Sequence, residues 1–223
     1  MKTLLVKDYR ILMTQKKSFF ILLLVGVIMV ISTFEIDFLT GYMMMMAMIL
    51  SLGTVNYDEL DNGMAFIMTL PANRKTYAIE KYVFTMINIV ACAAVMLMIY
   101  FITKGFVNWQ FGAGDMVSVT AGWICGIMIA ASVMIPLYLK FGAEKRRVVM
   151  MLLWGIVAVI AIGGQKLAEV MAGTEAMNTI NGFFTKISTL PVGVVVLAVV
   201  AVLVMVVIFS LGISIGIMKK KEF

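Results

Sequence analysis

Few side chains in this sequence are of the types that perform chemistry. The chain has no histidine, which removes the commonest general base and the commonest metal ligand. Its two cysteines, Cys92 and Cys125, both fall within apolar runs, where cysteine most often serves as a small buried side chain. No G-x-x-x-x-G-K-[ST] motif occurs, so the chain has no P-loop for a nucleotide phosphate. We therefore predict that the chain is not an enzyme and that it holds no catalytic, cofactor or metal site.

One methionine run has a spacing that could bind a soft metal. Residues 43–46 and Met48 include a Met-x-x-x-Met pair at Met44 and Met48, and thioethers are ligands for Cu(I). However, the 22 methionines are spread over the whole chain, and no cluster of histidine or cysteine marks an entrance. Adaptable packing and lining of apolar helices is the favoured interpretation, and a copper permease is kept as a minor alternative.

The elements that position these residues are apolar. Residues of the types AVILMFWYC make up 63% of the chain, charged residues make up 13%, and the mean hydropathy is +1.06. A soluble domain is about half apolar and about a quarter charged, so the composition excludes a soluble globular or disordered protein. One bilayer span needs about 20 mostly apolar residues, which leaves room for about six or seven spans. We predict an all-α membrane protein.

Six apolar stretches are the predicted transmembrane helices, and they form a single transmembrane domain over residues 1–223. The stretches cover residues 18–34, 39–55, 82–103, 116–139, 148–163 and 191–218. Of the 18 Lys and Arg residues, only Lys104, Lys166 and Lys186 fall in the loops on one side. All others lie in the N-terminal segment, the loops after the second and fourth spans, and the C-terminal tail. The positive-inside rule therefore places both termini in the cytoplasm.

An amphipathic surface helix is predicted ahead of the first span. Thr3, Lys7, Arg10 and Thr14 recur at steps of four and three residues, which places them on one helical face. Cations on that face suit the anionic headgroups of the inner leaflet. A basic cluster that only sets the topology explains the pattern equally well.

The predicted spans contain almost no ionisable side chain. Carboxylates and cations within the membrane are the usual working groups of ion-coupled transporters, so their scarcity argues against a transporter with its own energy coupling. Pro136 lies near the inner end of the fourth span, where it is tolerated if the carbonyl that it frees finds another donor. Two G-x-x-x-G patterns predict close helix packing. They are Gly122 with Gly126, and Gly212 with Gly216.

The loop between the second and third spans is too apolar for a solvated connection. Asp58 is placed to cap a short helix in which Leu60, Met64 and Ile67 follow at positions i, i+4 and i+7, before Pro71 ends it. An exposed apolar helix between two spans needs a partner surface, which is either the bilayer or a cytoplasmic protein. Acidic residues at the start of this helix disfavour anionic lipid, so docking to a protein is favoured.

In motif order, spacing and topology, the chain resembles the membrane subunits of ABC-2-type transporters. The resemblance spans essentially the whole chain and includes the basic N-terminal helix and the six spans. It rests on two patterns, Tyr57-Asp58-Glu59 … Leu70-Pro71-x-x-Arg74-x-x-Tyr77-x-x-x-Lys81-Tyr82 and Pro136 … Phe141-Gly142-x-x-Lys145-x-Arg147. Within the family, the chain is similar to the small permeases of peptide and phenol-soluble-modulin exporters.

The resemblance implies a pore-forming permease in the bacterial plasma membrane that performs no chemistry of its own. It would form a homodimer or a pseudo-symmetric dimer and would pair with two cytoplasmic ABC ATPases, which bind the ATP and Mg; no nucleic acid is implied. In this family a coupling helix between spans 2 and 3 and a second loop contact the ATPase. The residues that match the coupling helix are Tyr57, Asp58, Glu59, Leu60, Met64, Phe66, Ile67, Leu70, Pro71 and Arg74. Those that match the second loop are Phe141, Gly142, Glu144, Lys145 and Arg147.

Two functions from different classes follow from these patterns. The apolar, methionine-rich spans favour ATP-driven export of a hydrophobic or amphipathic cargo, such as a membrane-active peptide. The alternative is a membrane scaffold or regulator that transports nothing and recruits a cytoplasmic partner through the same loops. A neighbouring gene for an ABC ATPase would favour export.

Overall fold

The computed structural model describes most of the chain. The described residues are 1–14, 20–21, 23–26, 28, 36–59, 63–69, 73–106, 109, 112–141, 148, 151, 155, 159, 163, 166 and 192–221. They belong to two compact units, Met1–Gly142 with Val206–Phe223 and Ala143–Met205. The first unit contains the helices that matter for function.

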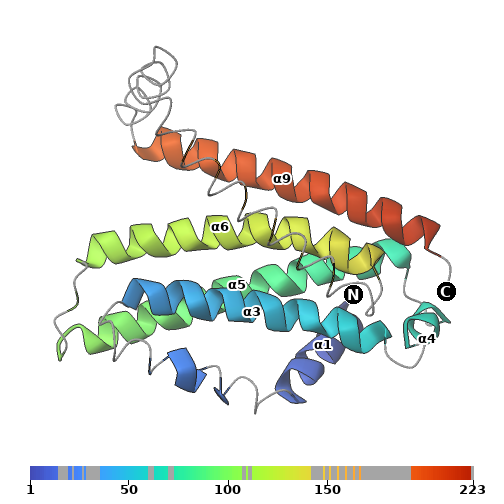
Figure 1. Cartoon of the computed structure of the whole chain (residues 1–223), viewed down its shortest axis with the longest axis horizontal. Helices are drawn as coiled ribbons and strands as arrows, with labels where there is room; N and C mark the ends of the chain where they lie inside the picture. The colour runs from blue at the N-terminus through green and yellow to red at the C-terminus, as the bar shows by residue number, and fades with distance from the viewer. Residues whose placement is uncertain are drawn as a thin grey trace. The chain divides into compact units, whose positions relative to one another are not determined.

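Every element assigned in the described residues is an α-helix (Figure 1). The helices are α1 (Lys2–Thr14), α3 (Ile36–Glu59), α4 (Gly63–Thr69), α5 (Arg74–Thr103), α6 (Ala113–Lys140) and α9 (Val192–Lys220). Four of them, α3, α5, α6 and α9, are long and apolar enough to cross a bilayer. They contain the predicted spans 39–55, 82–103 and 116–139 and all but the first residue of 191–218, so the helical, multi-pass class is confirmed. The predicted spans 18–34 and 148–163 lie largely outside the described residues.

The helices α3 and α5 extend past their predicted apolar spans. Helix α3 continues through Asp58 to Glu59, and α5 already begins at Arg74. The prediction that Asp58 caps the short helix is therefore wrong, because Asp58 lies in the last turn of α3 and α4 begins only at Gly63. The extra turns persist because charged side chains such as Asp58 find partners within the protein.

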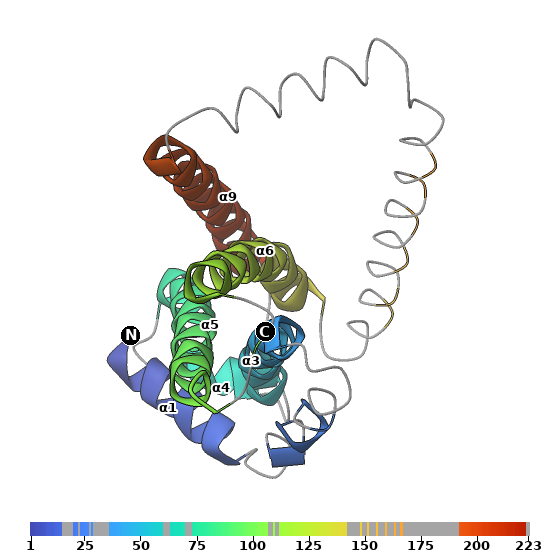
Figure 2. The same ribbon diagram turned by 90° about the vertical axis from the view of Figure 1, so that its left-hand side faces the viewer.

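Helices α3, α5 and α6 pack against one another, as the end-on view in Figure 2 shows. The start of α3, the end of α5 and the start of α6 meet in a buried cluster of Ile36, Tyr100 and Met116. Beside it, the Trp109 indole donates a hydrogen bond of 3.1 Å to the Thr103 hydroxyl. Because α3 begins where α5 ends and α6 begins, consecutive helices run in opposite directions.

A glycine admits α6 close to α3, although it is not one of the predicted packing glycines. The Trp123 indole of α6 lies against Gly41 of α3, where a Cβ atom would come within 2.5 Å of the ring. A larger residue at this position would push the two helices apart. No described atom lies within 4 Å of a Cβ built at Gly122, Gly126, Gly212 or Gly216. The described part of the chain therefore gives these four glycines no packing partner.

Pro136 interrupts the hydrogen bonding of α6, and α9 supplies the missing donor. Proline has no N–H, so the Ser132 carbonyl one turn earlier loses its helical partner. The Ser210 hydroxyl of α9 donates to that carbonyl instead. The Tyr82 hydroxyl of α5 lies 2.6 Å from Ser210 Oγ and 2.8 Å from Ser214 Oγ. The predicted need for another donor near Pro136 is confirmed, and the hydroxyls join α5, α6 and α9.

Candidate functional site

Most of the described charged side chains gather at one end of the unit, which we call the charged end. It comprises α1, α4, the C-terminal turns of α3, α6 and α9, and the first turns of α5 (Figure 1). Lys7 of α1 pairs with Asp58 of α3. Lys221, just after α9, lies 2.9 Å from Glu59 Oε1 and donates a hydrogen bond of 3.0 Å to the Leu139 carbonyl of α6. The N-terminal helix, the last turn of α3 and the C-terminal tail thus lie together.

A buried network of charges joins α1, α3 and α5. Lys81 Nζ contacts Asp8 Oδ2 and lies 2.8 Å from Asp58 Oδ2 and 3.1 Å from Thr54 Oγ1. Lys7 Nζ contacts Asp58 Oδ1 and lies 3.1 Å from Asp8 Oδ1. The side chains of Lys81, Asp8 and Asp58 are at most 2% exposed. Each of the three helices therefore contributes at least one buried charge to a single cluster.

Hydroxyl groups complete the network. Thr54 Oγ1 donates to Asp8 Oδ2 over 3.0 Å, and the Tyr77 hydroxyl donates to Asp58 Oδ2 over 2.8 Å. Lys81 Nζ also lies 5.0 Å from the centroid of the Tyr77 ring. Buried charges are tolerated only where they are paired and hydrogen-bonded, and these two carboxylates meet both conditions. Such a network fixes the relative placement of the helices that flank α4.

The predicted N-terminal helix is confirmed. However, contacts with α3 and α5 hold it, rather than the lipid headgroups that were expected. Leu4 and Asp8 form the buried side of α1, whereas Tyr9 is 57% exposed. Lys7 was expected near lipid headgroups and instead pairs with Asp58. The difference arises because Asp8, a carboxylate on the same helix, pairs with Lys81 of α5 and so holds α1 against that helix.

Helix α4 is the short helix predicted between the second and third spans, and its side chains differ sharply in exposure. Met64 and Ile67 are only 4% and 7% exposed, so they hold α4 against the rest of the unit. Phe66 is 68% exposed, and Tyr57 on the last turns of α3 is 49% exposed. Of the predicted partner contacts in this segment, Phe66 and Tyr57 thus expose aromatic surface, whereas Met64 and Ile67 are buried.

Two further residues of the predicted coupling segment have partners within the protein. Glu59 pairs with Lys221. Arg74 Nη1 donates to the carbonyls of Met218, Lys219 and Lys221 over 3.3, 3.0 and 3.0 Å. A cation is favoured at the C-terminus of a helix, so Arg74 stabilises the end of α9.

The second predicted contact loop is described only at its first residue. Phe141 follows α6 directly, and its ring centroid lies 5.3 Å from Lys140 Nζ. The other predicted contact residues outside the described part of the chain are Leu60, Leu70, Pro71, Gly142, Glu144, Lys145 and Arg147. Their contacts with a partner stay predictions.

Sequence reasoning missed the network because it read the lysines as topological charges. Lys7 and Lys81 were counted among the cytoplasmic cations, and Asp8 and Glu80 were given no role. The available signal was the presence of carboxylates inside otherwise basic segments next to the spans. A carboxylate in such a place is either solvated or paired with a cation, and burial decides for pairing at Asp8.

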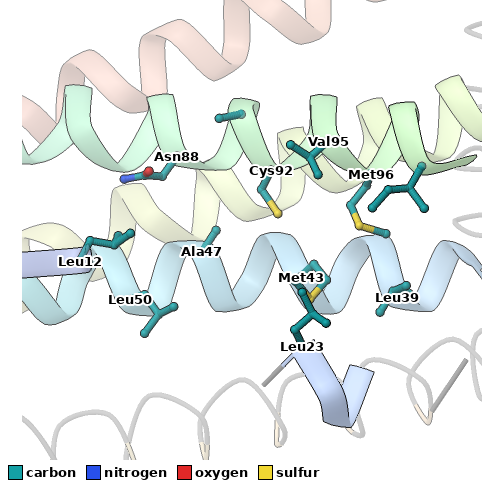
Figure 3. A pocket seen from close by; sticks show the side chains of 12 residues that line it. Leu12, Leu23, Leu39, Met43, Ala47, Leu50, Asn88, Cys92, Val95 and Met96 are labelled. Atoms are coloured by element: carbon teal, nitrogen blue, oxygen red, sulfur yellow. The ribbon is translucent and has the colours of Figure 1, made fainter. Parts of the chain in front are cut away.

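An apolar pocket of about 410 Å³ lies along α3 and α5 (Figure 3). Met43, Cys92 and Met96 line it together with aliphatic side chains, and Leu12 of α1 closes one end. Asn88 is the one amide among the described lining residues, and its Nδ2 donates to the Phe84 carbonyl of its own helix. The pocket therefore offers an almost purely apolar wall. The neighbouring Met44 and Met48 are buried, at 0% and 2% exposed, so the methionine run serves packing.

The fold and the charged end define a multi-pass helical membrane protein that displays a short helix between two of its long apolar helices. A comparison with known families then identifies the group. The sequence matches the model of the ABC-2 family transporter proteins over residues 3–219, so the chain belongs to that family. It is thus a permease component of an ABC transporter, and membrane subunits of this family generally partner with ATPase subunits. No curated protein and no solved structure matches the chain.

Proposed function

We propose that this chain is the membrane subunit of an ABC exporter that moves a hydrophobic or amphipathic cargo out of the cell. Separate ATPase subunits bind the ATP and Mg and hydrolyse the nucleotide, and the chain itself is not an enzyme and needs no cofactor. The observation that carries the proposal is the exposure pattern of α4. The buried side chains of Met64 and Ile67 hold the helix in place, while the side chain of Phe66 is exposed. A second candidate, the scaffold that only recruits a partner, would use the same surface.

The assembly that fits this role contains two ATPases and two copies of the permease, or two related permeases, in the bacterial plasma membrane. The charged end faces the cytoplasm. The gathering of α1, the first turns of α5 and the tail at that end supports this orientation, because these segments carry nine of the 18 Lys and Arg residues.

The charged end also supplies a route from the ATPase to the long helices. A ligand shifts a conformational equilibrium only through contacts that differ between the two states. Movement of α4 acts on α3 and α5, which flank it in the chain. These helices are joined to each other and to α1 through Asp58, Lys81 and Asp8. A push on α4 is therefore transmitted to three helices together.

Co-expression with a candidate ABC ATPase from an adjacent reading frame tests the proposed function. We expect the two proteins to co-purify after extraction in a mild detergent, and the ATPase to hydrolyse ATP faster in the complex than alone. An ATPase with its P-loop lysine replaced is the control, because it should bind without hydrolysis. A permease that purifies alone would contradict the proposal. A stable complex without ATP-dependent transport in vesicles would favour the scaffold.

The apolar pocket along α3 and α5 supports a cargo with an apolar surface, since ligand sites are commonly concave and apolar with few polar groups. Ala91 lines this pocket, whereas Ala94, on the same helix and also exposed, does not. Ala91→Phe is therefore expected to fill the pocket and to slow transport of an amphipathic peptide roughly tenfold, which corresponds to about 1.4 kcal/mol. Ala94→Phe should leave transport unchanged. The measurement is ATP-dependent uptake into inverted vesicles, and equal rates for the two variants would remove the pocket from the cargo path.

A further inference from the structure

Glu80 is a buried carboxylate that the network of charges does not neutralise. It lies on α5, ahead of the apolar stretch that begins at Tyr82, and its side chain is 0% exposed. Neither of its oxygens has a hydrogen-bond partner in the described part of the chain. Its nearest cation there is Lys81, whose Nζ lies 3.9 Å from Glu80 Oε2. Glu80 thus lacks the contacts that make a buried charge tolerable.

Lys81 has no hydrogen-bond donor left for Glu80. An ammonium group carries three N–H donors. Its nitrogen already contacts Asp8 Oδ2, lies 2.8 Å from Asp58 Oδ2 and donates to Thr54 Oγ1 over 3.1 Å. These three acceptors account for all three donors. The separation of 3.9 Å between Lys81 and Glu80 is the result.

The charges around Glu80 balance without it. The charged and titratable groups of the network beside it are Lys7 and Asp8 from α1, Asp58 from α3, and Tyr77 and Lys81 from α5. The two ammonium groups of this set match the two aspartates. An ionised Glu80 would add an unmatched negative charge next to Asp8, in a place shielded from water. A neutral Glu80 would leave the set balanced.

Asp8 also offers a hydrogen-bond acceptor for a proton carried by Glu80. Asp8 Oδ1 is buried and accepts no hydrogen bond in the described part of the chain, although Lys7 Nζ lies 3.1 Å away. Asp8 is one of the charged groups that act on the Glu80 carboxyl. A proton on Glu80 would turn that carboxyl into a donor and would let Asp8 accept the hydrogen bond. Where two carboxyl groups lie too close together for both to be charged, they commonly share one proton.

We propose that Glu80 is a proton-binding site, and that the charged end adopts its present arrangement with a proton bound to that carboxyl. Separation of α1 from α5 would expose Glu80 to water and release the proton to the cytoplasm. Acidification of the cytoplasm then favours the assembled charged end, and alkalinisation weakens it. This inference does not depend on which cargo or ATPase the permease uses.

Infrared spectroscopy of the full chain in lipid nanodiscs tests whether the carboxyl is neutral. We expect an absorption band of a protonated carboxylic acid at neutral pH that disappears as the pH is raised. The band should shift when the chain is made with glutamate labelled with ¹³C at the side-chain carboxyl, and should not shift with labelled aspartate. It should be lost in Glu80→Gln and kept in Glu59→Gln, because Glu59 is paired with Lys221. A wild-type spectrum without the band at neutral pH would overturn the proposal, as would a band that responds to labelled aspartate alone.

Thermal unfolding of the same proteins gives an independent measurement. Below the ordinary pKa of glutamate, about 4.3, Glu80 is neutral in both the folded and the unfolded chain, so Glu80→Gln should match the wild type. As the pH rises, the unfolded chain ionises while the folded chain must keep its proton, so the wild type loses stability relative to Glu80→Gln. A difference between Glu80→Gln and the wild type that does not change with pH would refute the proton site.

Discussion

Replacement of Phe66 with glutamate should abolish capture of the partner ATPase and leave the permease inserted in the membrane. Phe66 is 68% exposed on α4, so the substitution leaves the packing of the unit largely undisturbed. Buried aromatic anchors at protein interfaces commonly contribute about 2 kcal/mol or more, which corresponds to roughly a 30-fold or greater loss of affinity. A buried, unpaired carboxylate adds a desolvation penalty to that loss. Titration of nanodisc-bound permease with purified ATPase measures the affinity directly.

Phe106→Glu is the matched control for this experiment. Phe106 is 91% exposed in the turn after α5, at the opposite end of that helix from Arg74. The same chemical change there should leave ATPase binding as it is in the wild type. Met64→Glu provides the contrast, because Met64 is 4% exposed and its replacement should unseat α4 and lower stability as well as binding. If Phe66→Glu binds the ATPase like the wild type, the contact surface lies elsewhere, and α4 is not the coupling helix.

Replacement of Lys81 with methionine should lower the free energy of unfolding by about 3–5 kcal/mol. Methionine fills a similar volume without the charge, so Asp8 and Asp58 lose their shared buried cation and Thr54 loses a donor. Lys7, with a side chain that is 30% exposed, stays as the only ammonium group of the network. Chemical denaturation in detergent micelles, followed by tryptophan fluorescence, measures the loss.

Two further variants show whether the loss comes from burial of the charge. Lys75→Met removes the same charge from an exposed position on α5 and should change stability little. Combining Lys81→Met with Asp8→Asn should recover part of the loss, because one of the two orphaned carboxylates becomes neutral. Equal stability of Lys81→Met and Lys75→Met would mean that the network does not hold α1, α3 and α5 together.

The long helices follow from the sequence because a bilayer imposes them. A span needs about 20 apolar residues, and runs of that kind at 39–55, 82–103, 116–139 and 191–218 leave little choice of structure. The ends of the helices do not follow in this way. Whether α3 stops near residue 55 or continues to Glu59 depends on whether Asp58 finds a cation, and that cation comes from α1 and α5. Pairings between residues so distant in the chain leave no periodic signal.

The functional face of α4 was only partly predictable for a related reason. The spacing of Leu60, Met64 and Ile67 predicts an apolar stripe, which is interpreted as the docking surface, and Leu60 lies outside the described residues. In the structure Met64 and Ile67 of that stripe face inward, since the unit itself offers the nearest apolar surface. Phe66, which lies outside the stripe, is the residue on display. An exposed aromatic residue on the opposite face of a short helix is therefore a better candidate for the proposed contact than the stripe, which is buried at Met64 and Ile67.

The bond between Ser210 and the Ser132 carbonyl has a consequence for the synthesis of the protein. Helix α6 is made well before α9, so Pro136 enters the membrane while the residue that satisfies the freed carbonyl is still untranslated. An unpaired carbonyl in hydrocarbon costs about 1–3 kcal/mol, and only the arrival of α9 removes this cost. The hydrogen bonding of α6 is therefore completed only when α9 has been made, and a ribosome that stops ahead of α9 releases a nascent chain in which the Ser132 carbonyl still lacks this donor.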